Sequence, residues 1–439
     1  MKEHQHKPTS VRWQVSAALA AFALVSYMAR ANISIAAETM MPALHLTKIE
    51  MGEIFNGFLI GYAIFQIPGG ILGDRLGPRK TLAASAFVWC MATLLTGLTP
   101  WLVRGSLWLT FAVLWVVRFG LGLAEATTFP VGNRVVRNWM PPSERARAGS
   151  IMFMGTCTAS AITGPLVPWL IGRMGWQLSF VVGALPALIA AVVWYWWFRD
   201  SPDEHVGVNA GELTLIQSGE LHKVAQGTPA SSLRKLLRDR NVLLLTLSYT
   251  SEGYVLFLFV FWLYIYLVEQ RHFSMIRGGW MAALPWLTAL ALTPFGGALC
   301  DFVASRHGRL QGARVVVVLG YSVTSATLFL AAYAGSAYVS VAALALSIAF
   351  LMASEAGFWS AATHLAGRQV GAVSGVMNTA GIAGGILSTF LVSVFVEHFG
   401  WLAALASGSL MSFGCAVAWL TIREEKPGLP ARVKGFDSK

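Results

Sequence analysis

Two long apolar stretches joined by a short charged turn constrain this chain more than any other feature. The stretches cover residues 51–72 and 81–99, and the turn between them reads GDRLGPRK at residues 73–80. A bilayer core is crossed by about 20 apolar residues, and only helices or closed barrels satisfy their backbone groups there. A short turn rich in glycine and basic residues is typical of the cytoplasmic side. The pattern therefore predicts a hairpin of two transmembrane helices.

A second copy of this turn lies around Asp301, about half a chain length after Asp74 in the first copy. Glu355 follows Glu125 at nearly the same separation. A pattern that recurs after half the chain indicates an internal repeat. We therefore expect two related halves.

The composition excludes a soluble globular protein. The chain has 439 residues, of which 56% are hydrophobic and 12% charged, whereas a soluble domain carries roughly 25% charged residues. We expect an all-α membrane protein. Its twelve expected spans cover residues 13–37, 51–72, 81–99, 107–129, 147–171, 177–198, 241–267, 279–299, 314–334, 338–360, 370–395 and 401–422.

A single long polar stretch divides these spans into two groups of six. It covers residues 199–240 and is expected to be a cytoplasmic linker. The N-terminal six-helix bundle is then expected over residues 1–198, and the C-terminal bundle with a cytoplasmic tail over residues 241–439.

The distribution of basic residues predicts the orientation in the membrane. The net charge is +11, with 32 Lys and Arg residues. With a cytoplasmic N-terminus, 25 of them fall in the tails or in loops on that side, as the positive-inside rule requires. We expect cytoplasmic termini in a bacterial inner (plasma) membrane, and no nucleic-acid partner. The exceptions are Lys48, Arg104, Arg173, Arg271 and Arg277 on the far side, and Arg30 and Arg118 within spans.

Motifs of enzymes are missing from the sequence. It contains no Walker loop, no cluster of metal ligands and no nucleophile triad. Its four cysteines show no metal-binding spacing. We therefore expect no enzyme and no bound metal or cofactor.

Several motifs resemble those of a known transporter family. The pattern Gly69-x-x-x-Gly73-Asp74-Arg75 resembles the cytoplasmic loop signature of the major facilitator superfamily. Further stretches resemble the anion:cation symporter family of sugar-acid and other organic-anion transporters. The resemblance implies twelve helices in two pseudo-symmetric six-helix bundles, alternating access, and a proton as coupling ion. These further stretches are Tyr27–Asn32, Tyr62–Gly70, Arg118–Pro130 and Gly375–Asn378.

Arg30 lies deep in the first span, where a charge costs on the order of 3 kcal/mol by insertion scales. A substrate carboxylate held by two parallel hydrogen bonds would offset that cost. The alternative is an arginine paired with helix carbonyls or a neighbouring acid. By resemblance, Arg30 matches the family's carboxylate-binding arginine.

Glu125 lies seven residues after Arg118, so both face the same side of the fourth span. Burial disfavours a carboxylate's charge and a nearby cation favours it, so Glu125 is placed to take up and release a proton. The alternative is a static ion pair with Arg118. The resemblance assigns proton coupling to Glu125.

Ala29 departs from the family, because many relatives carry an acid just before the first-span arginine. The nearest substitutes are Glu252 and Glu355, in spans seven and ten. With one titrating acid, the protein would move one proton per monocarboxylate, unless Glu252 supplies a second site. The alternative is that both acids serve helix packing through hydroxyl partners.

Polar and aromatic residues are expected around the anion. Tyr27 is one helical turn from Arg30 and shares its face. Resemblance also places Tyr62, Asn378 and Trp359 at the substrate site. Their alternative role is ordinary interhelical bonding.

Charged residues at the cytoplasmic span ends are expected to bridge the halves when the inner side is shut, because this loop is a conformational latch in the superfamily. The alternative is a loop that only fixes topology. The residues are Asp74, Arg75, Arg79, Asp301 and Arg306.

These features predict a monomeric secondary active transporter that couples protons to a small organic anion. The alternative is proton-coupled efflux of drug-like or other solutes, which the Trp, Phe and Met residues of the spans would permit. Arg30 favours the anion, because a buried cation repels a cationic drug.

Overall fold

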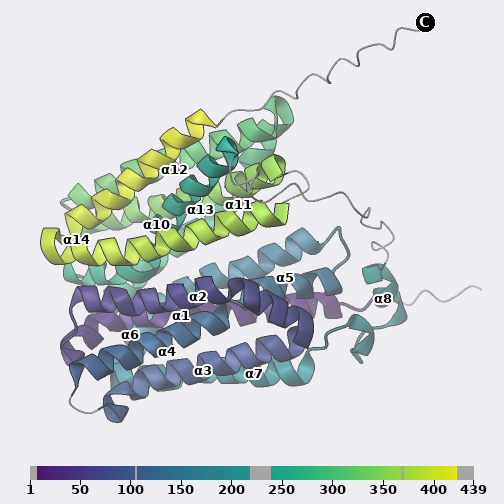
Figure 1. The fold of residues 1–439 in the computed structure, drawn as a ribbon, viewed down its shortest axis with the longest axis horizontal. Helices are drawn as coiled ribbons and strands as arrows, with labels where there is room; N and C mark the ends of the chain where they lie inside the picture. The colour runs from purple at the N-terminus through teal and green to yellow at the C-terminus, as the bar shows by residue number, and fades with distance from the viewer. Residues whose placement is uncertain (1–6, 104–105, 218–238, 367–369, 423–439) are drawn as a thin grey trace, which may run out of the picture.

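Two groups of helices, one from each half of the chain, make up the molecule (Figure 1). The computed structural model describes residues 7–103, 106–217, 239–366 and 370–422. The expected linker therefore extends beyond what is described, because residues 218–238 lie outside these ranges.

Helices of the N-terminal half contact one another, and so do those of the C-terminal half. The first group consists of α1 (Val11–Leu44), α2 (Lys48–Leu76), α3 (Pro78–Leu102), α4 (Leu107–Glu125), α5 (Thr128–Trp139), α6 (Arg145–Gly183) and α7 (Leu185–Trp197). The short elements η1 (Pro202–Glu204) and α8 (Ala210–Gln217) follow. The second group consists of α10 (Arg240–Glu269), α11 (Met275–His307), α12 (Arg309–Tyr333), α13 (Ala337–Ala366) and α14 (Val370–Thr421).

The described residues contain 10 helical segments long and apolar enough to cross a membrane. Two of these segments are 51 and 49 residues long, about twice what a bilayer needs. Each is broken by one glycine with non-helical backbone angles, Gly175 in α6 and Gly400 in α14. The break separates spans five and six in the first half and spans eleven and twelve in the second. The predicted fold of twelve spans in two related bundles is confirmed.

The fourth span differs from the prediction because its helix breaks at Ala126 and Thr127, between α4 and α5. Pro130 explains the break, since its ring would clash with the carbonyl of residue 126 in a continuous helix. The break leaves Glu125 as the last residue of α4.

The internal repeat extends to the backbone of the connections. The glycines with positive φ among the described residues are Gly77, Gly175, Gly308 and Gly400, at 82°, 79°, 94° and 78°. Gly77 and Gly308 join equivalent hairpins in the two halves, as do Gly175 and Gly400. A side chain is strained at these angles, so both halves use glycine to turn between consecutive spans.

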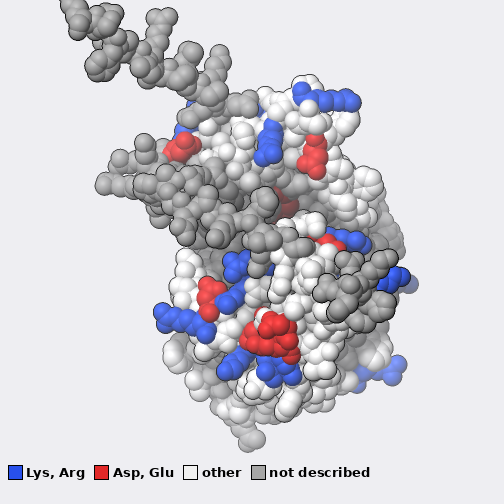
Figure 2. Space-filling model, turned by 90° about the vertical axis from the view of Figure 1, so that its right-hand side faces the viewer, with Lys and Arg blue, Asp and Glu red and all other residues white. Residues whose placement is uncertain are grey.

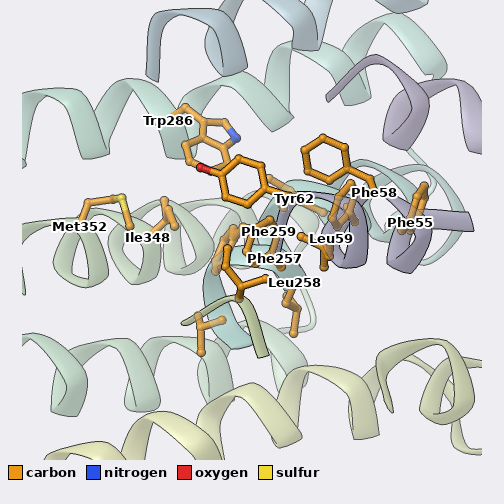
Figure 3. Packing of buried hydrophobic residues seen from close by; sticks show 14 of the residues in the cluster. Phe55, Phe58, Leu59, Tyr62, Phe257, Leu258, Phe259, Trp286, Ile348 and Met352 are labelled. Carbon is orange, nitrogen blue, oxygen red and sulfur yellow. The ribbon is translucent and has the colours of Figure 1, made fainter. Parts of the chain in front are cut away.

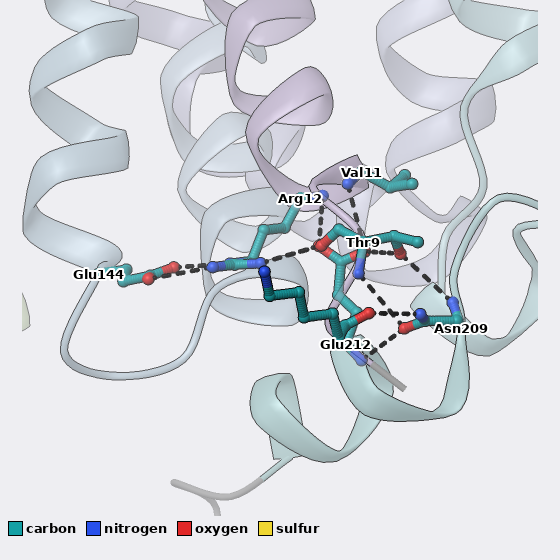
Figure 4. A network of polar contacts seen from close by, with 7 residues as sticks. Thr9, Val11, Arg12, Glu144, Asn209 and Glu212 are labelled. Atoms are coloured by element: carbon teal, nitrogen blue, oxygen red, sulfur yellow. Dashed lines mark hydrogen bonds and ion pairs between the residues drawn. The ribbon is translucent and has the colours of Figure 1, made fainter. Parts of the chain in front are cut away.

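The first part of the expected linker caps two helices of the N-terminal half. Glu212 of α8 is fully buried and accepts the backbone N–H groups of Val11 and Arg12 at 3.2 and 3.1 Å (Figure 4). Asp200 accepts the backbone N–H of Arg79 at 2.7 Å in the first turn of α3. The residues at the N-cap positions of α1 and α3 give no side-chain hydrogen bond. The two carboxylates therefore supply caps and favourable charge at these N-termini.

The end of the molecule at which α8 lies, called the linker end, carries mixed basic and acidic side chains (Figure 2). Arg12 illustrates the mixture, since it bonds Glu144 at 2.7 Å and Glu212 at 3.0 Å (Figure 4). α1 begins here and runs to Leu44 at the opposite end, called the far end.

The two halves are joined at the far end. Lys48 forms an ion pair with Glu269 at 3.1 Å between α2 and α10. Deeper in, Thr389 of α14 donates a hydrogen bond to Asn56 of α2. Phe55 stacks on Phe261 across the same boundary, with ring centroids 4.6 Å apart. The ion pair is partly exposed and contributes little, so the buried contacts hold this end closed.

Glycines bring the backbones of the two halves into direct contact nearby. A Cβ atom on Gly279 of α11 would lie 2.2 Å from the carbonyl oxygen of Gly164 in α6. Small residues allow such close approach between membrane helices.

Glu212→Ala is expected to lower the free energy of unfolding by about 1–2 kcal/mol, the usual loss for a helix cap. It should also speed hydrogen exchange at the first turn of α1, which loses its acceptor. Exchange measured by mass spectrometry over residues 11–16 tests this. Glu204→Ala, at an exposed acid of the same segment, is the control, and equal exchange in both variants would contradict the capping role.

Gly279→Leu is expected to separate the halves at the far end, because the new side chain meets backbone that cannot move aside within α6. Spin labels at Ala43 and Gln270, both exposed, should report a longer distance in a background without native cysteines. Gly297→Leu lies on the same helix, where a Cβ meets nothing within 4 Å. An unchanged distance in Gly279→Leu would rule out this contact as the closure.

Candidate functional site

Arg30 is a charged residue in the middle of α1 that is only 5% exposed. Its guanidinium lies over three aromatic rings, with centroids at 4.1 Å for Tyr27, 4.9 Å for Phe58 and 5.2 Å for Tyr62. The faces of these rings carry negative potential, so they stabilise a desolvated cation. The rings of α1 and α2 therefore hold Arg30 in a largely buried position.

The anionic neighbour of Arg30 is Glu125. The Arg30 Nε lies 3.4 Å from Glu125 Oε2, a long bond, and Ser26 donates its hydroxyl to Oε1. The Nη2 atom of Arg30 is buried and has no hydrogen-bond partner among the described residues. Arg30 is thus paired with a neighbouring acid, which is the alternative considered from the sequence. Its Nη2 nitrogen makes no hydrogen bond to a described residue.

Arg118 lies beside this pair and is 1% exposed. It donates to the carbonyl oxygens of Ala29 and Arg30 at 3.3 and 3.0 Å. A direct ion pair with Glu125, the alternative considered from the sequence, is not formed among the described residues. The Arg118 Nε atom is also buried without a partner in the described part of the chain. The site therefore contains two guanidinium groups and one carboxylate, an excess of one positive charge.

Glycines on α2 and α4 set the position of these groups. A Cβ on Gly122 would lie 2.0 Å from the carbonyl oxygen of Phe58, and one on Gly61 would lie 2.2 Å from that of Phe119. The two backbones are in contact, which only small residues permit. This contact brings the rings of α2 against the arginine and glutamate of α4.

Tyr62 extends from this cluster toward the other half. Its hydroxyl end is directed toward Trp286 of α11 (Figure 3). Both side chains are mostly buried, at 6% and 8% exposure. The cluster around Arg30 therefore borders the surface where the halves meet.

The second half holds a pair of acids, Glu252 of α10 and Glu355 of α13, within hydrogen-bonding range of each other. Tyr249 donates its hydroxyl to Glu355 at 3.2 Å, and Trp359 donates its indole N–H at 2.8 Å. Trp359 thus lies at this acid pair, in the opposite half from Arg30. Asn378 of α14 is partly exposed and bonds no other described residue.

The residues predicted to bridge the halves at the linker end contact their own halves. Asp74 pairs with Arg134 at 2.8 Å, and Arg79 donates to the carbonyl oxygen of Tyr195 at 2.7 Å. Arg306 lies over the ring of Phe302 at 4.1 Å. The two remaining residues, Arg75 and Asp301, are exposed. In this conformation the bridge is not formed among the described residues, and a latch role stays a prediction.

Sequence reasoning missed three partners of the charged groups. Ser26 lies one turn before Arg30 and donates to Glu125. Phe58 lies one turn before Tyr62, and its ring faces the guanidinium of Arg30. Tyr249 lies one turn before Glu252 and donates to Glu355. The spacing of three or four residues along a helix was the available signal.

Comparison with known proteins agrees with this architecture. A family model of the Major Facilitator Superfamily matches residues 19–389. A probable sulfoacetate transporter of Cupriavidus necator is 32% identical over 396 residues, covering 89% of both chains. A probable galactarate/D-glucarate transporter of Bacillus subtilis is 30% identical, covering 90% of this chain and 88% of the relative. A hexuronate transporter of the same organism is also 30% identical, covering 89% and 90%.

Solved structures share the fold at lower identity. The inward-facing, unoccupied bacterial homologue of the human lysosomal transporter Spinster has a TM-score of 0.71 and 16% identity, covering 94% of this chain and 95% of its own. The inward open xylose transporter XylE of Escherichia coli has a TM-score of 0.72 and 14% identity, covering 95% and 97%. The family model and the relatives together establish that this chain belongs to the Major Facilitator Superfamily, as a multi-pass membrane transporter.

Proposed function

We propose that the protein is a proton-coupled symporter of a small organic anion, a sugar acid or another carboxylate. One observation carries the proposal: the buried cluster of Arg30, Arg118 and Glu125 has one excess positive charge and two guanidinium nitrogens without a hydrogen-bond partner among the described residues. A buried charge requires a partner. A carboxylate from the substrate supplies both the missing charge and the missing acceptors.

The names of the relatives support the same class of cargo. Sulfoacetate, galactarate, glucarate and hexuronates are all anions at neutral pH. A hydroxylated acid would also find the hydroxyls of Tyr27 and Tyr62 and the amide of Asn378. Efflux of a cationic drug fits this cluster poorly, because the excess charge repels it.

Competition for Arg30 gives a mechanism of coupling. In this structure, Glu125 accepts hydrogen bonds from Arg30 and Ser26. A proton on Glu125 would neutralise its carboxylate and weaken the ion pair with Arg30. The guanidinium of Arg30 would then be free to bind a substrate carboxylate with two hydrogen bonds. Loss of the proton would restore the internal pair and release the anion. Proton and anion therefore bind together and leave together.

The two helix groups, α1 to α8 and α10 to α14, are proposed to move as rigid units in a monomer of the bacterial inner membrane. With the linker end in the cytoplasm, as the basic residues favour, closure at the far end corresponds to access from inside. Asp74, Arg75, Arg79, Asp301 and Arg306 would bridge the halves in the opposite state.

Arg30→Ala is expected to abolish binding of carboxylates, because it removes the guanidinium that would donate hydrogen bonds to them. Thermal shifts of purified protein against sulfoacetate, galactarate, glucarate and glucuronate measure this, since a ligand at 100 times its Kd adds about 2.7 kcal/mol of stability. Arg30→Lys keeps the charge but not the fork, and should bind at least tenfold more weakly. Shifts in Arg30→Ala equal to those of the unmodified protein would refute the anion site.

Glu125→Gln is expected to lose proton-driven accumulation and keep counterflow exchange. The amide cannot titrate, but it still leaves Arg30 free for the anion. Uptake of the anion identified by thermal shift, in proteoliposomes with and without a pH gradient, separates the two activities. The matched control is Glu53→Gln at a glutamate of α2. Accumulation that persists in Glu125→Gln would place the coupling elsewhere.

A further inference from the structure

The acid pair of the C-terminal half has no role in the cluster around Arg30. Glu252 is 4% exposed and lies against Glu355 of the neighbouring helix. A third helix, α14, closes the pair, since a Cβ on Gly381 would lie 3.7 Å from Glu252 Oε2. The pair therefore lies among α10, α13 and α14.

The donors to this pair are neutral. The Tyr249 hydroxyl reaches both oxygens of Glu355, at 3.3 and 3.2 Å, and the indole of Trp359 reaches one at 2.8 Å. Among the described residues, no Lys, Arg or His contacts either acid. The other ionisable groups facing the pair or its donor Tyr249 are Tyr321 of α12, Cys415 of α14 and Tyr27 of α1.

Two carboxylates in contact without a cation repel each other strongly in a medium of low polarity. One shared proton removes the repulsion and replaces it with a short hydrogen bond between carboxylic acid and carboxylate. The hydroxyl and indole donors then stabilise the oxygen that carries the remaining charge. The arrangement is consistent with one proton on two acids.

A separate observation is a buried hydroxyl group near the pair. Tyr321 is 0% exposed, its hydroxyl has no partner among the described residues, and both acids lie within its electrostatic reach. Buried hydroxyls are nearly always hydrogen-bonded, so water or a hydrated proton is the natural partner. The pair itself is not sealed off, because Glu355 is partly exposed and its donor Trp359 is 42% exposed.

We propose that Glu252 and Glu355 share a transported proton and form a second proton site, in addition to Glu125. The proton is taken from water on one side of the membrane, forms an O–H bond to one carboxylate oxygen, and returns to water on the other side. With two protons, a monoanion moves with one net positive charge and a dianion moves without net charge.

The first test needs no substrate. Infrared spectra of the purified full chain at about pH 7 should contain the carbonyl band of a protonated carboxylic acid assigned to the pair. Glu252→Gln and Glu355→Gln should each lose the same band, and the double variant should lose no more. Glu397→Gln, an acid outside the pair, should leave it unchanged. Because the same loss is expected from either single variant, one that folds is sufficient.

Two results of this experiment would overturn the proposal. If neither single variant changes the band, the acids do not share a proton. If replacing choline chloride with sodium chloride removes the band from the unmodified protein, the pair is a site for sodium ions.

The second test measures charge movement and rests on the proposed function. Currents on supported membranes and isotope uptake, with the anion identified by thermal shift, give the charge moved per substrate. The unmodified protein should move one more positive charge per cycle than Glu355→Gln, and equal charges would overturn the proposal. If no anion is transported at all, the proposed function fails, whereas the infrared result still decides whether the pair holds a proton.

Discussion

A guanidinium in the middle of a membrane helix is the feature on which the rest of this structure depends. Arg30 is stabilised by three aromatic rings and one carboxylate, and that carboxylate is the last residue of a helix broken by a proline. Charge in this environment is tolerated only with partners. The close contact of α2 and α4 brings the rings of α2 and the carboxylate of α4 to one place.

The pattern of apolar stretches was sufficient to predict twelve spans and two halves, because lipid leaves a chain almost no other choice. The identity of the charged residues was equally visible. Their pairing was not, because helical spacing gives the face of a residue but not which neighbouring helix it meets. Glu125 faces the same side as Arg118, yet it bonds Arg30 of α1, while Arg118 bonds the backbone of α1.

Helix caps supplied by residues distant along the chain could also not be predicted from the sequence. Asp200 and Glu212 lie in a polar stretch that the sequence predicts to be a linker. Nothing in the neighbouring sequence indicates that Glu212 caps α1 or that Asp200 caps α3. The signal lies instead in what those helices lack, since neither begins with a residue whose side chain caps it. By its contacts, the first part of the linker, up to Gln217, therefore belongs to the N-terminal half.

The meeting of Gly164 and Gly279 has a consequence for how the transporter is driven. Where two helices touch through their main chains, no bulky side chain must leave a socket or change rotamer before they part. The barrier to parting is then set by the buried contacts around it, such as the Thr389–Asn56 hydrogen bond and the Phe55–Phe261 stack. The glycine contact can therefore open and close without rearrangement of side chains within it, so small differences in ligand and proton occupancy elsewhere in the protein can shift the balance between the two states.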